Sequence, residues 1–256
     1  MKLSKRVSGL VGEATKGVRK LIAQHEIKNI LALFSGGKDS LVSTHIVWKA
    51  VRDSNINFEV IHIDTTCALP GVQDYVIQTS KRLGWPLKIL RPKVDFWTLA
   101  EKWGAPTPRR RWCCYHLKLE PIREYTKTLK SPRLHILGLR AWESPSRLKK
   151  ANSGKLNRCY WDRKSETWVY NPILWWRDRD IDEYIKVNKL PVNPTYEKVG
   201  TGGECFCGVF KTIREVLLVK NNYPDFFQKL VELESKFRNN GSLLYINSKR
   251  VYVRDL

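Results

Sequence analysis

The stretch Leu31-Ala-Leu-Phe-Ser-Gly-Gly-Lys-Asp-Ser-Leu41 decides the fold. An apolar, strand-like run from Ile30 to Phe34 leads into the polar loop Ser35–Ser40, and an amphipathic helical pattern follows. A strand that feeds a glycine-rich loop at the start of a helix is typical of a phosphate site, because backbone N–H groups and the helix dipole favour an anion there. Lys38 adds a full positive charge. The spacing differs from G-x-x-x-x-G-K-[ST], which excludes a Walker A loop. An ordinary tight turn with incidental serines is the alternative.

Strand-like and helical segments alternate over the first 190 residues. Strands are expected at 30–34, 58–64, 86–90 and 134–139, and helices at 3–24, 71–83, 94–103 and 113–129. This alternation predicts an α/β fold with a doubly wound, Rossmann-like parallel sheet covered by helices on both faces. Ligands of such sheets bind at the carboxyl ends of the strands. We therefore expect residues 35–40, 64–67 and 140–147 to meet in one crevice.

The chain of 256 residues is long enough for one sizeable domain with an addition. We expect an N-terminal amphipathic helix over 1–25, a nucleotide-binding domain over 26–200, and a C-terminal segment over 201–256 with a cysteine-rich turn, helices and a hairpin. Residues 148–168 are polar and are expected to form a flexible loop or hairpin. No apolar run approaches the roughly 20 residues of a membrane span, and the start of the chain has no apolar signal core. A cytoplasmic protein without a membrane partner is expected.

The charge balance points to a polyanionic partner. Lys and Arg number 46 against 25 Asp and Glu, a formal net charge of +21. Residues 102–133 hold nine basic side chains against two acidic ones, and residues 140–164 hold eight against two. Tryptophan and tyrosine are interleaved with these cations, a combination that suits phosphate backbones and unstacked bases. Nucleic acid, either tRNA or DNA, is the favoured partner, and a solvated basic face is the alternative.

The six cysteines include two close pairs, which are Cys113-Cys114 and Cys205-Phe-Cys207. Structural disulfides are not expected in a cytosolic chain. Thiolates are suitable ligands for an iron–sulfur cluster or for zinc, and buried free thiols without any metal are the remaining alternative. Cys67 and Cys159 are isolated in the sequence.

Five motifs, in order along residues 28–190, resemble the phosphoadenosine-phosphosulfate (PAPS) reductase family, a branch of the PP-loop ATP pyrophosphatase superfamily with an adenine nucleotide α-hydrolase-like fold. The motifs are Ser35-Gly-Gly-Lys-Asp-Ser40, Ile63-Asp-Thr-Thr66 with Pro70, Cys113-Cys114 with Lys118-x-x-Pro121, Gly138-Leu-Arg-Ala-Trp-Glu-Ser-Pro-Ser-Arg147, and Asn171-Pro-Ile-Leu-Trp175.

The resemblance implies a set of site residues. ATP with Mg²⁺ would be bound by Ser35, Gly36, Gly37, Lys38, Asp39, Ser40, Asp64, Thr65 and Gly138. Lys38, Asp39, Arg140 and Arg147 would carry the catalysis, with the two arginines neutralising the pyrophosphate that leaves. A [4Fe–4S] cluster would be held by Cys113, Cys114, Cys205 and Cys207, although the second pair is Cys-x-x-Cys in the family and Cys-x-Cys here.

The leading hypothesis is activation of a nucleic-acid acceptor by ATP-dependent adenylation, followed by sulfur transfer from a donor protein or from sulfide. Family reductases use a nucleophilic cysteine near the C-terminus, and no cysteine follows Cys207 in this sequence. Lys38-Asp39 in the loop is the form of the ATP-cleaving members. The alternatives are a reductase acting on adenosine or phosphoadenosine phosphosulfate, and a non-catalytic nucleic-acid-binding module. The oligomeric state is open, with a homodimer among the options.

Overall fold

The computed structural model describes residues 2–237, 241–246 and 249–256. They form two compact units, each assembled from several segments of the chain. The first unit comprises Met1–His62, Val76–Lys88 and Tyr125–Val192, and the second comprises Ile63–Tyr75, Ile89–Glu124 and Asn193–Leu256. The segments of the two units alternate along the sequence. The boundaries of the three consecutive domains expected from the sequence stay a prediction.

A six-stranded sheet is the framework of the fold. Its strands are β1 (Asn29–Leu33), β2 (Asn57–Ile63), β3 (Leu87–Leu90), β4 (Arg133–Ile136), β5 (Cys159–Asp162) and β6 (Thr167–Tyr170). Their order is β3-β2-β1-β4-β6-β5. β1 runs parallel to both β2 and β4, β4 runs parallel to β6, and β5 is an antiparallel edge strand. The predicted α/β fold with a mostly parallel sheet is confirmed.

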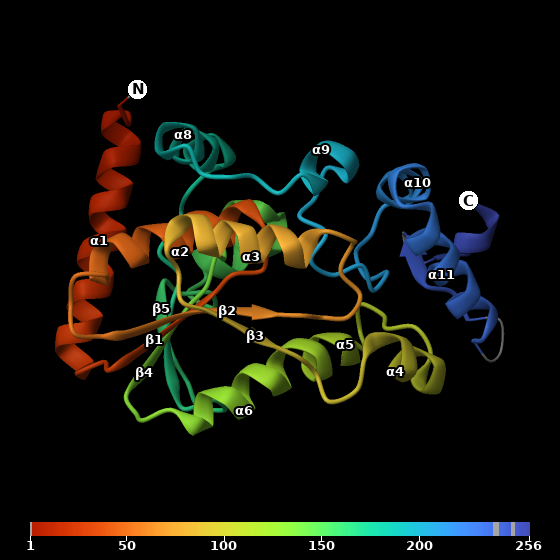
Figure 1. Cartoon of the computed structure of the whole chain (residues 1–256), viewed down its shortest axis with the longest axis horizontal. Helices are drawn as coiled ribbons and strands as arrows, with labels where there is room; N and C mark the ends of the chain where they lie inside the picture. Colours follow the sequence, from red (N-terminus) through yellow and green to blue (C-terminus); the bar gives the residue numbers. More distant parts are fainter. Residues whose placement is uncertain (1, 238–240, 247–248) are drawn as a thin grey trace. The chain divides into compact units, whose positions relative to one another are not determined.

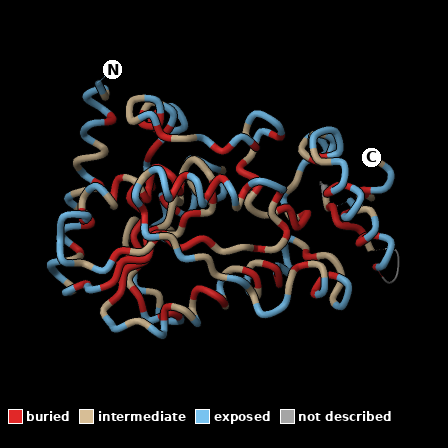
Figure 2. The backbone as a smooth tube through the Cα atoms, viewed as in Figure 1, coloured by how far each residue is buried: buried red, intermediate tan, exposed pale blue. Residues whose placement is uncertain are grey.

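The centre of the sheet is apolar, as its sequence requires. Ala32 of β1 lies between Val60 of β2 and Ile136 of β4, and all three side chains are buried. Figure 2 shows these strands as largely buried segments. Strands buried on both faces read as continuous apolar runs, and this pattern made them recognisable in the sequence.

Helices of the first unit pack beside this sheet. α1 (Lys5–His25), α2 (Lys38–Val51) and α8 (Asp178–Asn188) contact one another (Figure 1). α3 (Val72–Leu83) and α6 (Glu120–Thr128) begin in segments of the second unit and end in the first. The hairpin expected within 148–168 is confirmed as β5–β6, but the residues before it form α7 (Pro145–Asn152) rather than a loop. The side chain of Ser144 accepts a hydrogen bond from the Arg147 N–H and caps α7.

The second unit is mostly helical. It contains α4 (Phe96–Trp103), α5 (Trp112–Cys114), a π-helical turn over Tyr115–Leu119, α9 (Thr195–Val199), α10 (Ile213–Asn222), α11 (Pro224–Ser235), the strands β7 (Leu244–Ile246) and β8 (Lys249–Val251), and a final 3₁₀ turn over Val253–Asp255. The predicted C-terminal helices and hairpin are therefore present, while part of the hairpin's turn (247–248) lies outside the described residues.

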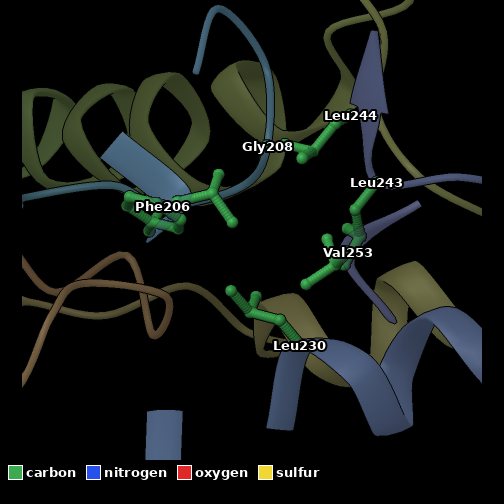
Figure 3. Close-up of a pocket in the computed structure, with 7 residues that line it drawn as sticks. Phe206, Gly208, Leu230, Leu243, Leu244 and Val253 are labelled. Atoms are coloured by element: carbon green, nitrogen blue, oxygen red, sulfur yellow. The ribbon is translucent and has the colours of Figure 1, made fainter. Parts of the chain in front are cut away.

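A small apolar pocket lies in the core of this unit. Figure 3 shows Phe206, Leu230, Leu243 and Val253 directed toward one another around it. Gly208 also lines it, with a positive φ of 87°, and an added Cβ there would collide with the Leu243 carbonyl oxygen. Since the lining is entirely apolar, we assign the pocket to core packing rather than to a ligand.

Within the described residues, none of the helices is both long enough and apolar enough to cross a membrane.

Candidate functional site

The phosphate loop between β1 and α2 is shaped by its own two serines. The Ser40 hydroxyl donates a hydrogen bond to the Gly37 carbonyl oxygen at 2.9 Å and accepts one from the Ser35 N–H at 3.2 Å. The Gly37 N–H donates to the Ser35 hydroxyl at 3.3 Å. Gly36 has a φ of +93°, a conformation that favours glycine. The hydroxyls thus fix the loop conformation, and their predicted contact with phosphate stays a prediction.

The N-terminus of α2 faces the end of the loop. The helix begins at Lys38, and its N-cap residue, Gly37, has no side chain to satisfy the first N–H groups. An uncapped N-terminus of a helix this long offers donors and partial positive charge to an anion.

Gly138, predicted as a site residue, lies against this loop after β4. A Cβ added at Gly138 would come within 2.6 Å of the Ser40 nitrogen and 2.7 Å of the Asp39 carbonyl carbon. Only glycine allows the two backbones to approach this closely.

Arg140 is held beside the loop by two carboxylates. Its Nε lies 2.8 Å from Asp39 Oδ2, and its Nη2 lies 2.7 Å from Asp178 Oδ1. Its Nη1 donates to the Trp176 carbonyl oxygen at 3.5 Å. Burial raises the pKa of Asp39, while the adjacent Arg140 guanidinium opposes that shift. Asp39 and Arg140, each predicted as a site residue, are therefore brought together, with Asp39 orienting the arginine.

The other two predicted cations also have acidic neighbours. Lys38 Nζ lies 3.1 Å from Asp182 Oδ1, on α8. Arg147 of α7 forms an ion pair with Glu143, whose carboxylate also accepts a hydrogen bond from the Arg140 N–H at 2.9 Å. Burial lowers the pKa of Arg147. Asp178 and Asp182 were not predicted as site residues, and their spacing of four residues at the start of a helix is the signal that could have found them.

Asp64 and Thr65, also predicted to bind the nucleotide, lie in the second unit just after β2. Asp64 pairs with Arg91 at 3.1 Å and accepts a hydrogen bond from the Thr66 N–H at 2.9 Å. The Thr65 hydroxyl donates to the Glu204 carbonyl oxygen at 2.8 Å. Their role in nucleotide binding stays a prediction.

Five of the six cysteines gather in the second unit. The Sγ atoms of Cys67 and Cys205 are 3.7 Å apart, and those of Cys113 and Cys207 are 3.6 Å apart. Thiol hydrogen bonds link Cys114 to Cys113 and Cys205 to Cys207. All six cysteines are free thiols.

Cys67 is isolated in the sequence, but the structure places it beside Cys205. The Phe206 N–H donates to the Cys67 carbonyl oxygen at 2.7 Å, and the Leu69 N–H donates to the Gly203 carbonyl oxygen at 2.9 Å. Residues 67–69 therefore run beside residues 203–206. This backbone pairing places Cys67 next to Cys205.

The cluster has a positively charged neighbour in the half-buried Lys118. Burial disfavours the charged ammonium, but Cys205, Glu204 and Cys114 raise the pKa of Lys118. A hydrogen bond from Cys113 lowers the pKa of Cys114 to about 6, in spite of burial, and Lys118 acts in the same direction. In the part of the chain that the structure describes, no three His, Cys, Asp or Glu side chains converge as a ready metal site. The predicted ligand role of Cys113, Cys114, Cys205 and Cys207 stays a prediction.

The chain is similar to proteins of a known family. The family model of the phosphoadenosine phosphosulfate reductase domain matches residues 29–224. An uncharacterized protein of Methanocaldococcus jannaschii is 34% identical over 91% of this chain, and the alignment covers 54% of that protein, so the chain spans about half the length of this relative. Adenosine 5'-phosphosulfate reductase 1 of Bacillus subtilis is 26% identical, with 64% of this chain and 66% of the relative covered.

Two solved structures share the fold. The PAPS reductase of Candida auris has a TM-score of 0.53 at 20% identity, covering 77% of this chain and 93% of its own. The U34-tRNA thiolase of Methanococcus maripaludis, solved with its [4Fe–4S] cluster, has a TM-score of 0.54 at 14% identity, covering 90% of this chain and 79% of its own. At these identities the likeness shows the fold alone. On the match over residues 29–224, the chain belongs to the phosphoadenosine phosphosulfate reductase family.

Proposed function

We propose that this chain is an AMP-forming, ATP-dependent enzyme that adenylates a nucleic-acid acceptor and then replaces the adenylate with sulfur. The observation that carries the proposal is that a phosphate loop with three nearby cations occurs in the same chain as a cluster of five thiols, three of them buried. A phosphate loop alone serves many nucleotide reactions, and a thiol cluster alone is an ordinary structural feature. Together they favour a reaction that uses a nucleotide and handles sulfur.

ATP binding and cleavage would fall to the first unit. The N-terminus of α2 and Lys38 would hold the β and γ phosphates of the magnesium-bound nucleotide, and Arg140 and Arg147 would stabilise the pyrophosphate as it leaves. An acceptor oxygen would attack the α phosphorus, and the bond to the β-phosphate bridging oxygen would break. Positioning and charge stabilisation dominate such reactions, so no general base is obligatory. The contact of Asp39 with Arg140 at 2.8 Å supports a positioning role for this aspartate.

Sulfur handling would fall to the second unit. The donor set of Cys113, Cys114, Cys205 and Cys207 is chemically suited to a [4Fe–4S] cluster, because thiolates are its ordinary ligands and Lys118 offsets their charge. A cluster held by three of these cysteines would leave one iron open for a sulfide, whereas four cysteine ligands would occupy all four irons. The present Sγ–Sγ contacts of 3.6 and 3.7 Å are those of packed thiols, so these pairs would have to separate around a cluster. Iron and zinc contents distinguish the cluster from a zinc site.

A nucleic-acid acceptor is supported by charge and by exposed aromatic side chains. The net charge of +21 is far more than a nucleotide substrate requires. Trp142 and Trp161 are each 42% exposed, and the Arg177 guanidinium lies 4.8 Å from the Trp142 ring. Flat exposed rings beside cations suit unpaired bases and phosphates.

The test is a thiolation assay with anaerobically purified full-length chain, ATP, Mg²⁺, sulfide and unmodified tRNA or DNA. We expect a thiolated nucleoside by mass spectrometry and one AMP per product, with both lost in Lys38→Ala. Release of sulfite from adenosine or phosphoadenosine phosphosulfate without ATP would instead show a sulfonucleotide reductase. Tight nucleic-acid binding without any AMP formation would leave the binding-module alternative.

A further inference from the structure

The start of α8 supplies carboxylates to two of the cations in the phosphate site. Asp178 lies 2.7 Å from Arg140, and Asp182 lies 3.1 Å from Lys38. Residues four apart lie on one face of a helix, so the two carboxylates act side by side.

The orientation of α8 is fixed by a different residue. Asp180 is 1% exposed and accepts two hydrogen bonds from the Arg6 guanidinium of α1, each at 2.9 Å. It also accepts a hydrogen bond from the Arg177 N–H at 2.8 Å, which ties down the first turn of the helix. Because Asp180 anchors α8, Asp178 and Asp182 are not needed to hold it in place.

The exposed carboxylates of Asp178 and Asp182 can turn toward water, whereas the buried guanidinium of Arg140 cannot. The side chains of Asp178 and Asp182 are 81% and 60% exposed, while that of Arg140 is 8% exposed. Asp39 keeps its contact with Arg140 from the loop side. An anion that binds here therefore has to displace the two exposed carboxylates or bring a cation that neutralises their repulsion.

The charges decide between these outcomes. Three cations face four carboxylates, namely Lys38, Arg140 and Arg147 against Asp39, Glu143, Asp178 and Asp182. These seven groups sum to −1 when all are charged. A free polyphosphate would meet repulsion from the exposed carboxylates, whereas Mg²⁺ on the polyphosphate cancels two negative charges and gives those carboxylates a cation to face.

We propose that Asp178 and Asp182 are specificity residues that make the phosphate site discriminate against free polyphosphate and accept its magnesium-bound form. This inference rests on the proposed nucleotide site, and it assigns to α8 a role in choosing the charge state of the ligand. The ion pairs of Asp178 with Arg140 and of Asp182 with Lys38 compete with a metal-free anion for the same cations.

The test is calorimetric binding of pyrophosphate to the full chain, once with EDTA and once with excess Mg²⁺, in wild type and in the double variant Asp178→Asn, Asp182→Asn. Loss of two exposed ion pairs should tighten binding of free pyrophosphate by about three- to thirtyfold. The double variant should bind magnesium pyrophosphate as tightly as the wild type or more weakly, so its preference for the magnesium form should be smaller. Asp53→Asn removes one negative charge, as each single variant does, from an exposed residue paired with Arg52 and should change neither value.

The outcomes separate the two proposals. A wild type that binds neither form of pyrophosphate refutes the nucleotide site and this inference with it. A wild type that binds both forms equally, or a double variant whose affinity for free pyrophosphate does not rise, refutes the inference alone. Should the double variant fail to fold, each single variant provides the same comparison with a smaller expected change.

Discussion

Replacing Gly138 by alanine is expected to displace the phosphate loop. The added methyl carbon would lie 2.6 Å from the Ser40 nitrogen and 2.7 Å from the Asp39 carbonyl carbon. Both are backbone atoms, so no flexible side chain can swing away. Because ordinary contacts begin near 3.5 Å, the loop or the segment after β4 would have to move by roughly 0.8 Å.

The cost follows from this overlap. Overpacking of a tight contact typically costs about 1–3 kcal/mol. If the loop yields, its N–H groups and Lys38 lose their arrangement around a phosphate, and affinity for magnesium pyrophosphate should fall by about 5- to 150-fold. If the fold resists instead, the same cost appears in the free energy of unfolding.

Calorimetric titration measures the loss of affinity for magnesium pyrophosphate, and urea unfolding measures the loss in the free energy of unfolding. Gly9→Ala, within α1, is the matched control, because an added methyl there meets nothing within 4 Å. Alanine is the better helix former, so this control should gain about 0.5–1 kcal/mol of stability without a change in binding. Wild-type affinity and wild-type unfolding in Gly138→Ala would refute the assigned role of this glycine.

Four further results are expected. Lys38→Ala should abolish ATP–pyrophosphate exchange while nucleic-acid binding in a filter assay is retained; equal loss of both would argue against separate sites. Burial alone would raise the pKa of Asp180, but hydrogen bonds from Arg6 and the Arg177 backbone N–H hold this pKa below its usual value. The contribution of the Asp180 carboxylate to stability is therefore present above about pH 3.9 and disappears as the pH falls further. Asp180→Asn should therefore lose about 1.5–3 kcal/mol in urea unfolding at pH 7 and much less near pH 2, and a pH-independent loss would contradict the ion pair. Cys113→Ser should lower the iron content of anaerobically purified protein and Cys159→Ser should not, whereas an iron-free wild type would remove the cluster. Affinity for tRNA should fall steeply with salt, and a flat dependence would exclude phosphate contacts as its main source.

The strand, loop and helix around the phosphate site could be predicted because each signal is local. The apolar run of β1, the two glycines and the amphipathic pattern of α2 lie within about twenty residues, and each supports the same structure. α7 was missed because residues 148–168 are polar. Its start signal, Ser144 followed by Pro145, was nevertheless present in the sequence.

Contacts between distant parts of the chain could not be predicted. Cys67 and Cys205 are 138 residues apart in sequence, and only the backbone pairing of residues 67–69 with 203–206 brings them together. Similarly, Asp182 is 144 residues from Lys38, and its exposed position on α8 gave it no apolar pattern to mark it. Motifs indicated which side chains are candidates for the chemistry, but the partners that tune their charge depend on tertiary packing.

The most direct test of AMP-forming activity follows the fate of ATP labelled at the α phosphate, incubated with the full chain, Mg²⁺, sulfide and unmodified tRNA or DNA. Thin-layer separation of the products, with pyrophosphate measured in parallel, reports which phosphate bond breaks. We expect labelled AMP and an equal amount of pyrophosphate, both dependent on Lys38. Labelled ADP with free phosphate would contradict cleavage between the α and β phosphates, and with it the proposed adenylation.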